Sequence, residues 1–221
     1  MRRSAPFIIV AVVALAAIGT GTSLYRAKRA ANPQLKITKQ TGEQGESAHV
    51  LGPAGAPTIL EEFGDFQCPP CGRLSEPINQ LQKKYNLRVI FREFPLPMHA
   101  HAREAAYAAE AAGRQGRFWE MHDLLFREQG VWSNSTDARA LFSAYAGMLQ
   151  LDLGRFKQDM DNPDVQRLVE SDQKRGATIG VKTTPTIFLN NEAVPPDQLM
   201  PETFPAAVEN AVNKAKPSSS P

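Results

Sequence analysis

Cysteine is scarce in this sequence, and the scarcity narrows what the protein can be. Only two of its 221 residues are cysteines, which excludes a small secreted scaffold held together by many disulfides. A large excess of one charge is also missing, because 25 Lys and Arg residues stand against 23 Asp and Glu residues. This balance gives no reason to expect a nucleic-acid partner. With 42% hydrophobic residues, the composition is that of a globular chain rather than a disordered one.

Charged residues are absent from Ser4 to Tyr25, a run of 22 residues. As a helix with a rise of about 1.5 Å per residue, this run reaches about 33 Å, close to the thickness of the hydrocarbon core of a bilayer. We therefore expect residues 1–25 to be an N-terminal signal-anchor or transmembrane segment that holds the protein at a membrane. The alternative is a signal peptide that is cleaved, because the most apolar stretch also has the length typical of such peptides.

The rest of the chain divides by composition. Residues 26–57 contain three Pro and four Gly and show little apolar periodicity, so we interpret them as a flexible tether. Residues 58–215 have the patterns of a folded domain, and residues 216–221 are a Ser- and Pro-rich tail that we expect to be disordered. The domain is mildly acidic, because residues 58–221 keep 18 basic and 21 acidic residues while the N-terminal part is basic.

Hydrophobic periodicity predicts an alternation of strands and helices within the domain. Strands are expected at 58–63, 88–94, 186–189 and 193–194, and helices at 69–85, 100–112, 118–128, 137–149, 152–160, 162–177 and 202–215. Thr136, Asp152 and Asn162 are expected to cap three of these helices. The first part is then a parallel β-α-β crossover, and the last part is a hairpin followed by a helix. We predict an α/β fold with a helical insertion between the βαβ half and the ββα half.

Cys68 and Cys71 are separated by two prolines and lie where the first strand ends and a helix begins. The nucleophile of disulfide exchange is the thiolate, and a cysteine with a pKa of about 8.5 is only about 3% thiolate at pH 7. The start of a helix offers unpaired N–H groups and a partial positive charge, which favour the thiolate at Cys68 but not one turn further in. We predict that Cys68 attacks and Cys71 resolves, and we expect no cofactor.

Three segments of the chain stand out as a set. They are LEEFGDFQCPPC from Leu60 to Cys71, the segment FPLPMHAHAREA that begins at Phe94, and Thr184-Pro185-Thr186 in front of a later strand. Together they resemble the DsbA-like thiol:disulfide oxidoreductases of the thioredoxin superfamily. The resemblance covers about residues 50–215. The combination is more specific than two cysteines at this spacing, because it includes the strand–loop–helix context and a distant Thr-Pro.

The resemblance implies roles for three further residues. Pro185 would form a cis peptide bond facing the cysteine pair, rather than a trans bond at a strand start, and Thr184 would contact the mixed disulfide. Glu62 would be a buried acid that relays protons, whereas Glu61 on the opposite face of the strand would be solvated. Two positions depart from DsbA itself, because Pro70 replaces a histidine and Thr184 replaces a valine. The resemblance therefore leaves the direction of exchange open.

Together, these features imply an exported enzyme that forms, or reduces, disulfides in other proteins. The catalytic domain would lie outside the cytoplasm, in the periplasm or at the cell surface, or would be secreted if the N-terminal segment is cleaved. Its substrates would be extracytoplasmic proteins with cysteines, and a quinone-linked membrane protein would be its redox partner. The alternative is a thioredoxin-like metallochaperone with Cys68 and Cys71 as metal ligands, joined by His99 or His101.

Overall fold

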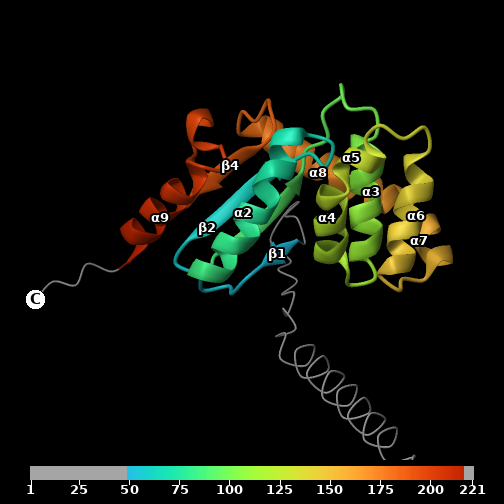
Figure 1. The fold of residues 1–221 in the computed structure, drawn as a ribbon, viewed down its shortest axis with the longest axis horizontal. Helices are drawn as coiled ribbons and strands as arrows, with labels where there is room; N and C mark the ends of the chain where they lie inside the picture. The colour runs from blue at the N-terminus through green and yellow to red at the C-terminus, as the bar shows by residue number, and fades with distance from the viewer. Residues whose placement is uncertain (1–48, 217–221) are drawn as a thin grey trace, which may run out of the picture. The chain divides into compact units, whose positions relative to one another are not determined.

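A computed structural model of the protein describes residues 49–216 (Figure 1). The predicted membrane segment, most of the predicted tether and residues 217–221 lie outside this range. None of the helices within residues 49–216 has both the length and the apolar content needed to cross a membrane.

The described residues form a five-stranded sheet with the order β1-β3-β2-β4-β5. The strands are β1 (Val50–Leu51), β2 (Ile59–Gly64), β3 (Arg88–Glu93), β4 (Thr186–Leu189) and β5 (Glu192–Ala193). Strands β2 and β3 are parallel, and the other neighbouring pairs are antiparallel. The parallel crossover and the hairpin are confirmed, and so is the predicted α/β fold.

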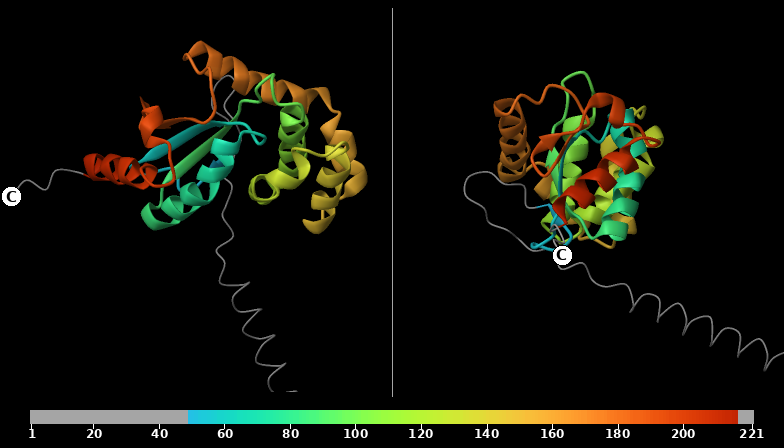
Figure 2. Two further views of the ribbon diagram at one scale, coloured as in Figure 1. Left: turned by 45° about the horizontal axis from the view of Figure 1, so that its top comes forward. Right: turned by 90° about the vertical axis from the view of Figure 1, so that its left-hand side faces the viewer.

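Helices cover both faces of this sheet (Figure 2). Helices α2 (Pro69–Tyr85) and α9 (Phe204–Ala215) cover one face, where the main hydrophobic core includes Leu60, Phe91 and Ile187. Helix α8 (Pro163–Thr178) covers the other face, and its Gly176 lies so close to the sheet that a Cβ there would be 2.7 Å from the ring of Phe94. The two faces therefore have separate cores.

A helical insertion lies between β3 and β4, as predicted. Besides α8 it contains α3 (Ala102–Gly113), α4 (Phe118–Arg127), α5 (Gln129–Trp132), α6 (Ala138–Met148) and α7 (Leu153–Met160), and the short 3₁₀ helix η1 (Pro196–Gln198) follows β5. Asp152 and Asn162 cap their helices as expected. The prediction for Thr136 is wrong, because the side chain of Asp137 accepts the hydrogen bond from the backbone N–H of Ala140. The sequence pattern does not predict α5.

The folded part begins earlier than the sequence suggests. Composition predicts a flexible tether over residues 26–57, but Val50 and Leu51 pair with Ile90 and Val89 of β3. Strand β1 is only two residues long, which is too short for an alternating pattern to mark it. Its start is fixed by His49, whose ring stacks on Phe118 with the centroids 3.4 Å apart. This correction places the edge of the sheet inside the range assigned to the tether.

Candidate active site

Cys68 lies at the N-cap position of α2, directly after the loop that leaves β2. Its backbone is extended, with φ −75° and ψ 117°, and its carbonyl accepts the first helical hydrogen bond, from the N–H of Gly72 at 3.2 Å. The next two residues are prolines, so the first backbone N–H available at this helix start belongs to Cys71. Both cysteines carry thiols that are not joined in a disulfide, and both are buried.

The two thiols have opposite acidities. Hydrogen bonding from the Cys71 thiol lowers the pKa of Cys68 to about 6 against the cost of burial, and the nearby side chain of Thr184 and the backbone of Cys71 lower it further. Burial raises the pKa of Cys71 well above its ordinary value, and the hydrogen bond to Cys68 raises it further. Cys68 is therefore the sulfur that ionises near neutral pH, and the main cause is the Cys71 thiol, with the backbone N–H of the helix start as a smaller one.

Thr184 and Pro185 lie beside Cys68, although they precede a strand on the far side of the insertion. The peptide bond between them is cis, as the resemblance implied. The carbonyl oxygen of Thr184 accepts a hydrogen bond from the thiol of Cys68 at 3.2 Å. The hydroxyl of Thr184 is buried and has no hydrogen-bond partner among the described residues, so it is available to a thiolate.

Glu62 lies in β2 beneath the cysteines and is only 3% exposed. Its Oε1 atom has no hydrogen-bond partner within residues 49–216. Burial raises the pKa of Glu62 to about 8, and the nearby Cys68 adds to the shift, so the carboxyl is protonated at neutral pH. Its charge also raises the pKa of Cys71, which places Glu62 within electrostatic reach of both sulfurs.

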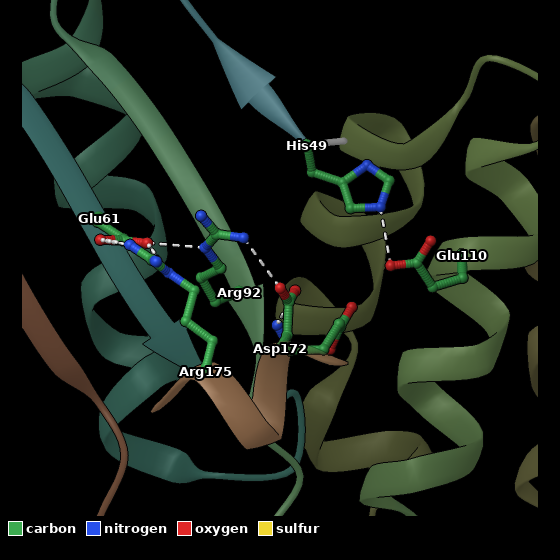
Figure 3. A network of polar contacts seen from close by, with 7 residues as sticks. His49, Glu61, Arg92, Glu110, Asp172 and Arg175 are labelled. Atoms are coloured by element: carbon green, nitrogen blue, oxygen red, sulfur yellow. Dashed lines mark hydrogen bonds and ion pairs between the residues drawn. The ribbon is translucent and has the colours of Figure 1, made fainter. Parts of the chain in front are cut away.

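Glu61 does not behave as the sequence suggests, and the prediction that it is solvated is wrong. It is 8% exposed, and its Oε1 atom lies 2.7 Å from Nε of Arg92 and 3.2 Å from Nε of Arg175 (Figure 3). Arg92 also binds Asp172 at 3.0 Å. Helix α8 supplies Arg175 and Asp172, so it turns the face expected to meet solvent into a buried ionic network.

A second buried pair joins the edge of the sheet to the insertion. Nε2 of His49 lies 2.8 Å from Oε1 of Glu110 in α3 (Figure 3). Near it, Glu93 is completely buried, and burial together with the charges of Glu110 and Asp172 raises its pKa well above the ordinary value. These groups stand apart from the cysteine pair and connect structural elements.

His99 and His101 do not join the cysteines in a metal site. Nδ1 of His99 lies 2.7 Å from Oδ2 of Asp65, a buried carboxylate that also accepts hydrogen bonds from the backbone N–H groups of Leu96 and Gln67. His101 occupies the N-cap position of α3. In the part of the chain from 49 to 216, no three His, Cys, Asp or Glu side chains are grouped so that they could hold a metal ion.

Two glutamines at the site are not marked by any sequence signal. Gln67 lies in the loop before Cys68, and Gln129 is the first residue of α5. The side-chain amide of Gln129 donates to the carbonyl oxygens of Phe66 and Cys68. A glutamine at the start of a short, unpredicted helix has no distinguishing pattern, so only the structure brings it to the cysteines.

Comparisons with known proteins agree with this architecture. A family model described as Thioredoxin matches residues 44–210. The chain is 25% identical to a thioredoxin-like oxidoreductase from Silicibacter pomeroyi, with a TM-score of 0.62 over 76% of this chain and 91% of that one. The fold is shared with BdbD from Bacillus subtilis, which is 24% identical with a TM-score of 0.64 over 77% of this chain and 93% of that one.

The curated relatives are longer proteins that are described as Na(+)/H(+) antiporters. The chain is 41% identical over 145 residues to Na(+)/H(+) antiporter NhaA 1 from Salinispora arenicola, a match that covers 64% of this chain and 21% of the antiporter. A similar match, at 36% identity, is found with NhaA 1 from Mycolicibacterium gilvum. The chain thus spans about a fifth to a quarter of the length of these relatives.

Proposed function

Because this chain belongs to the thioredoxin family, we propose that it is a thiol:disulfide oxidoreductase in which Cys68 and Cys71 form the redox pair. The observation that carries the proposal is the asymmetry of the pair. One buried sulfur at a helix start ionises near neutral pH, and the other, one turn further in, stays protonated. This division suits a nucleophile and a resolving thiol that act in sequence.

Exchange in the oxidising direction has two steps. A substrate thiolate attacks the Cys68 sulfur of the Cys68–Cys71 disulfide, and the intramolecular bond breaks to leave Cys71 as a thiolate. A second substrate thiolate then attacks the substrate sulfur of the mixed disulfide, and Cys68 leaves as a thiolate. The substrate loses two electrons, and the pair gains them. The low pKa of Cys68 makes it a good leaving group in the second step.

Glu62 and Thr184 would serve these steps from either side of the pair. We propose that protonated Glu62 supplies the proton that Cys71 takes up as it leaves, and that it accepts the proton in the reverse reaction. Thr184 would donate its unpartnered hydroxyl to the Cys68 thiolate. Its backbone, beside cis Pro185, would face the substrate peptide.

The substrates we propose are cysteine-containing proteins outside the cytoplasm, with the domain held at a membrane by the N-terminal segment. Two observations support this location. The chain has an uncharged run of 22 residues near its start, and the relatives that match about two thirds of its residues are described as Na(+)/H(+) antiporters. The reduced pair must pass its two electrons on before it can act again. We propose a quinone-linked membrane protein as the recipient.

The test uses the full-length protein in detergent, preset to the disulfide form, with a reduced peptide that carries two cysteines. We expect the peptide to be oxidised as the protein is reduced. Offered the oxidised form of the same peptide, Cys71→Ser should trap a mixed disulfide at Cys68, because no second thiol is present to resolve it, whereas Cys68→Ser should trap none. Circular dichroism would show that both variants are folded. A folded wild-type protein that exchanges no disulfide with the peptide, and a Cys71→Ser variant without a trapped adduct, would refute the proposal.

The location is tested separately. In intact spheroplasts, an added protease should digest the domain, and removal of quinone from the cells should leave the Cys68–Cys71 pair reduced. A domain that is protected until the membrane is lysed would contradict the proposed location without affecting the redox chemistry.

A further inference from the structure

The side chain of Gln129 spans the loop that carries Cys68. Its Nε2 atom lies 2.6 Å from the carbonyl oxygen of Phe66 and 3.0 Å from the carbonyl oxygen of Cys68. A glutamine amide has two N–H donors, so one side chain can serve both carbonyls. These two carbonyls flank Gln67, the residue that leads into the nucleophile.

The first turn of α2 is shaped to receive this amide. A Cβ built on Gly72 would lie 3.0 Å from Oε1 and 3.2 Å from Nε2 of Gln129, which is tighter than most contacts of that kind. The N–H of Gly72 and the amide of Gln129 also donate to the same carbonyl oxygen, that of Cys68. The absence of a side chain at position 72 therefore leaves the space that the Gln129 amide occupies.

The side chain of Gln67, in the same loop, also forms hydrogen bonds to the helical insertion. Its Nε2 atom donates to the carbonyl oxygen of Ser133 at 3.0 Å, and its Oε1 atom accepts from the N–H of His101 at 2.7 Å. The stretch from Phe66 to Cys68 is thus bound by side-chain hydrogen bonds to both α5 and the start of α3. The insertion holds the nucleophile's backbone, although neither cysteine belongs to it.

We propose that Gln129 is a positioning residue for disulfide exchange, which fixes the carbonyl groups of Phe66 and Cys68 and thereby the Cys68 sulfur at the start of α2. The proposal rests on the proposed function of the cysteine pair and adds the helical insertion as the part that sets its reactivity. The physical basis is electrostatic and geometric. Carbonyl oxygens carry partial negative charge, which opposes a nearby thiolate, and N–H donors directed at them offset that charge. A fixed backbone also keeps the sulfur within reach of the Cys71 N–H.

The experiment measures the ionisation of Cys68 in the reduced full-length protein, from the pH dependence of its alkylation by iodoacetamide. The main variant is Gln129→Met, which keeps the length of the side chain against Gly72 and removes both donors. Loss of hydrogen bonds of ordinary strength corresponds to a decrease in the thiolate-to-thiol ratio of about threefold or more. We expect the inflection to move to higher pH by that factor and the equilibrium with glutathione to shift toward the disulfide form.

Gln115→Met is the matched control. Gln115 also uses its amide to bind backbone, with Nε2 3.2 Å from the carbonyl oxygen of Asp152 and Oε1 2.9 Å from its N–H. Both of its partners lie in the insertion and away from the loop that carries Cys68. This variant should lose stability comparable to that lost by Gln129→Met, yet its Cys68 inflection should stay at the wild-type pH.

A second variant, Gln129→Glu, keeps the proposal testable if Gln129→Met does not fold. Gln129→Glu keeps the shape but places a carboxylate against two carbonyl oxygens, so the inflection should move further than in Gln129→Met. A folded Gln129→Met or Gln129→Glu variant with the wild-type inflection would overturn the proposal. The titration reads the thiolate directly, so this result would differ from failure of the proposed function, in which the wild-type protein ionises Cys68 but exchanges no disulfide.

Discussion

Glu61 and Glu62 are neighbours in β2, yet they face opposite sides of the sheet and meet opposite surroundings. Both are buried, at 8% and 3% exposure. On the side covered by α8, Glu61 is paired with Arg92 and Arg175. On the side covered by α2, no ion pair of Glu62 is found within residues 49–216, and burial raises its pKa to about 8.

Both acids are buried, so burial alone does not distinguish their roles. The presence or absence of a paired arginine does. A buried carboxylate bound by two arginines joins elements, here β2, β3 and α8. A buried carboxyl without a cation holds a proton near neutral pH and can exchange it, which is what a group beneath a reactive thiol requires. The face of β2 toward α8 therefore stabilises the fold, whereas the face toward α2 carries the group proposed to transfer protons.

Arg92→Met removes the arginine that binds both Glu61 and Asp172, and we expect it to have the largest effect on stability. It leaves Glu61 with only the half-exposed Arg175 and removes the cation from Asp172, so a buried network loses its centre. Breaking a buried ion pair costs about 3–5 kcal/mol, and we expect the free energy of unfolding to fall by about that amount. Urea denaturation of the full chain measures it. If the loss were below about 1 kcal/mol, the paired face would not be the structural one.

Glu62→Gln changes the acid on the α2 side of β2, and we expect it to slow disulfide exchange. The amide keeps the shape of the side chain but cannot pass a proton to or from Cys71. General acid–base catalysis contributes at least about 10²-fold, so we expect resolution of the mixed disulfide to slow by about that factor at pH 7. Stopped-flow kinetics with a peptide substrate measures it. Glu61→Gln is the control, and it should keep the wild-type rate while losing stability.

The same Glu62→Gln variant should be more stable than the wild type at alkaline pH. The folded protein keeps the proton of Glu62 up to about pH 8, whereas the unfolded chain releases it above about pH 4.5. Since the folded state then binds more protons, wild-type stability falls as pH rises through this window. The variant lacks that cost, so it should gain about 2 kcal/mol or more at pH 8 and little at pH 4. Urea denaturation at the two pH values decides, and an equal difference at both would contradict the assignment.

Arg175→Met should have the smallest effect. The Arg175 side chain is 42% exposed, and its contact with Glu61 supplements a pair that Arg92 already makes. Exposed ion pairs contribute about 0–1 kcal/mol, so the loss of stability should lie in that range and shrink at high salt. Thermal unfolding at two salt concentrations checks it. A loss as large as that of Arg92→Met would mean that both arginines carry the network equally.

Sequence patterns predicted the parts of the site that depend on local spacing. The position of Cys68 and Cys71 at a strand–helix junction follows from the patterns of β2 and α2 alone, whereas Glu62, six positions before Cys68, is pointed to only by the family resemblance. The surroundings of Glu61 do not follow from these patterns, because Arg175 comes from 114 positions away in the chain. Alternation in a strand predicts which residues share a face, but it does not predict what covers that face. Gln129 was missed for the same reason, since its backbone partners are 61 and 63 positions away.

Cys68 and Thr184 are 116 positions apart in the sequence, which affects how the site assembles during translation. Protein synthesis completes β2, α2 and β3, which contact one another locally, well before it reaches the strand behind Thr184. An unfinished chain therefore holds both thiols and the helix start between them while the residue that contacts Cys68 has not yet been made. The sulfur that ionises most readily is thus made 116 positions before the residue whose carbonyl oxygen it binds.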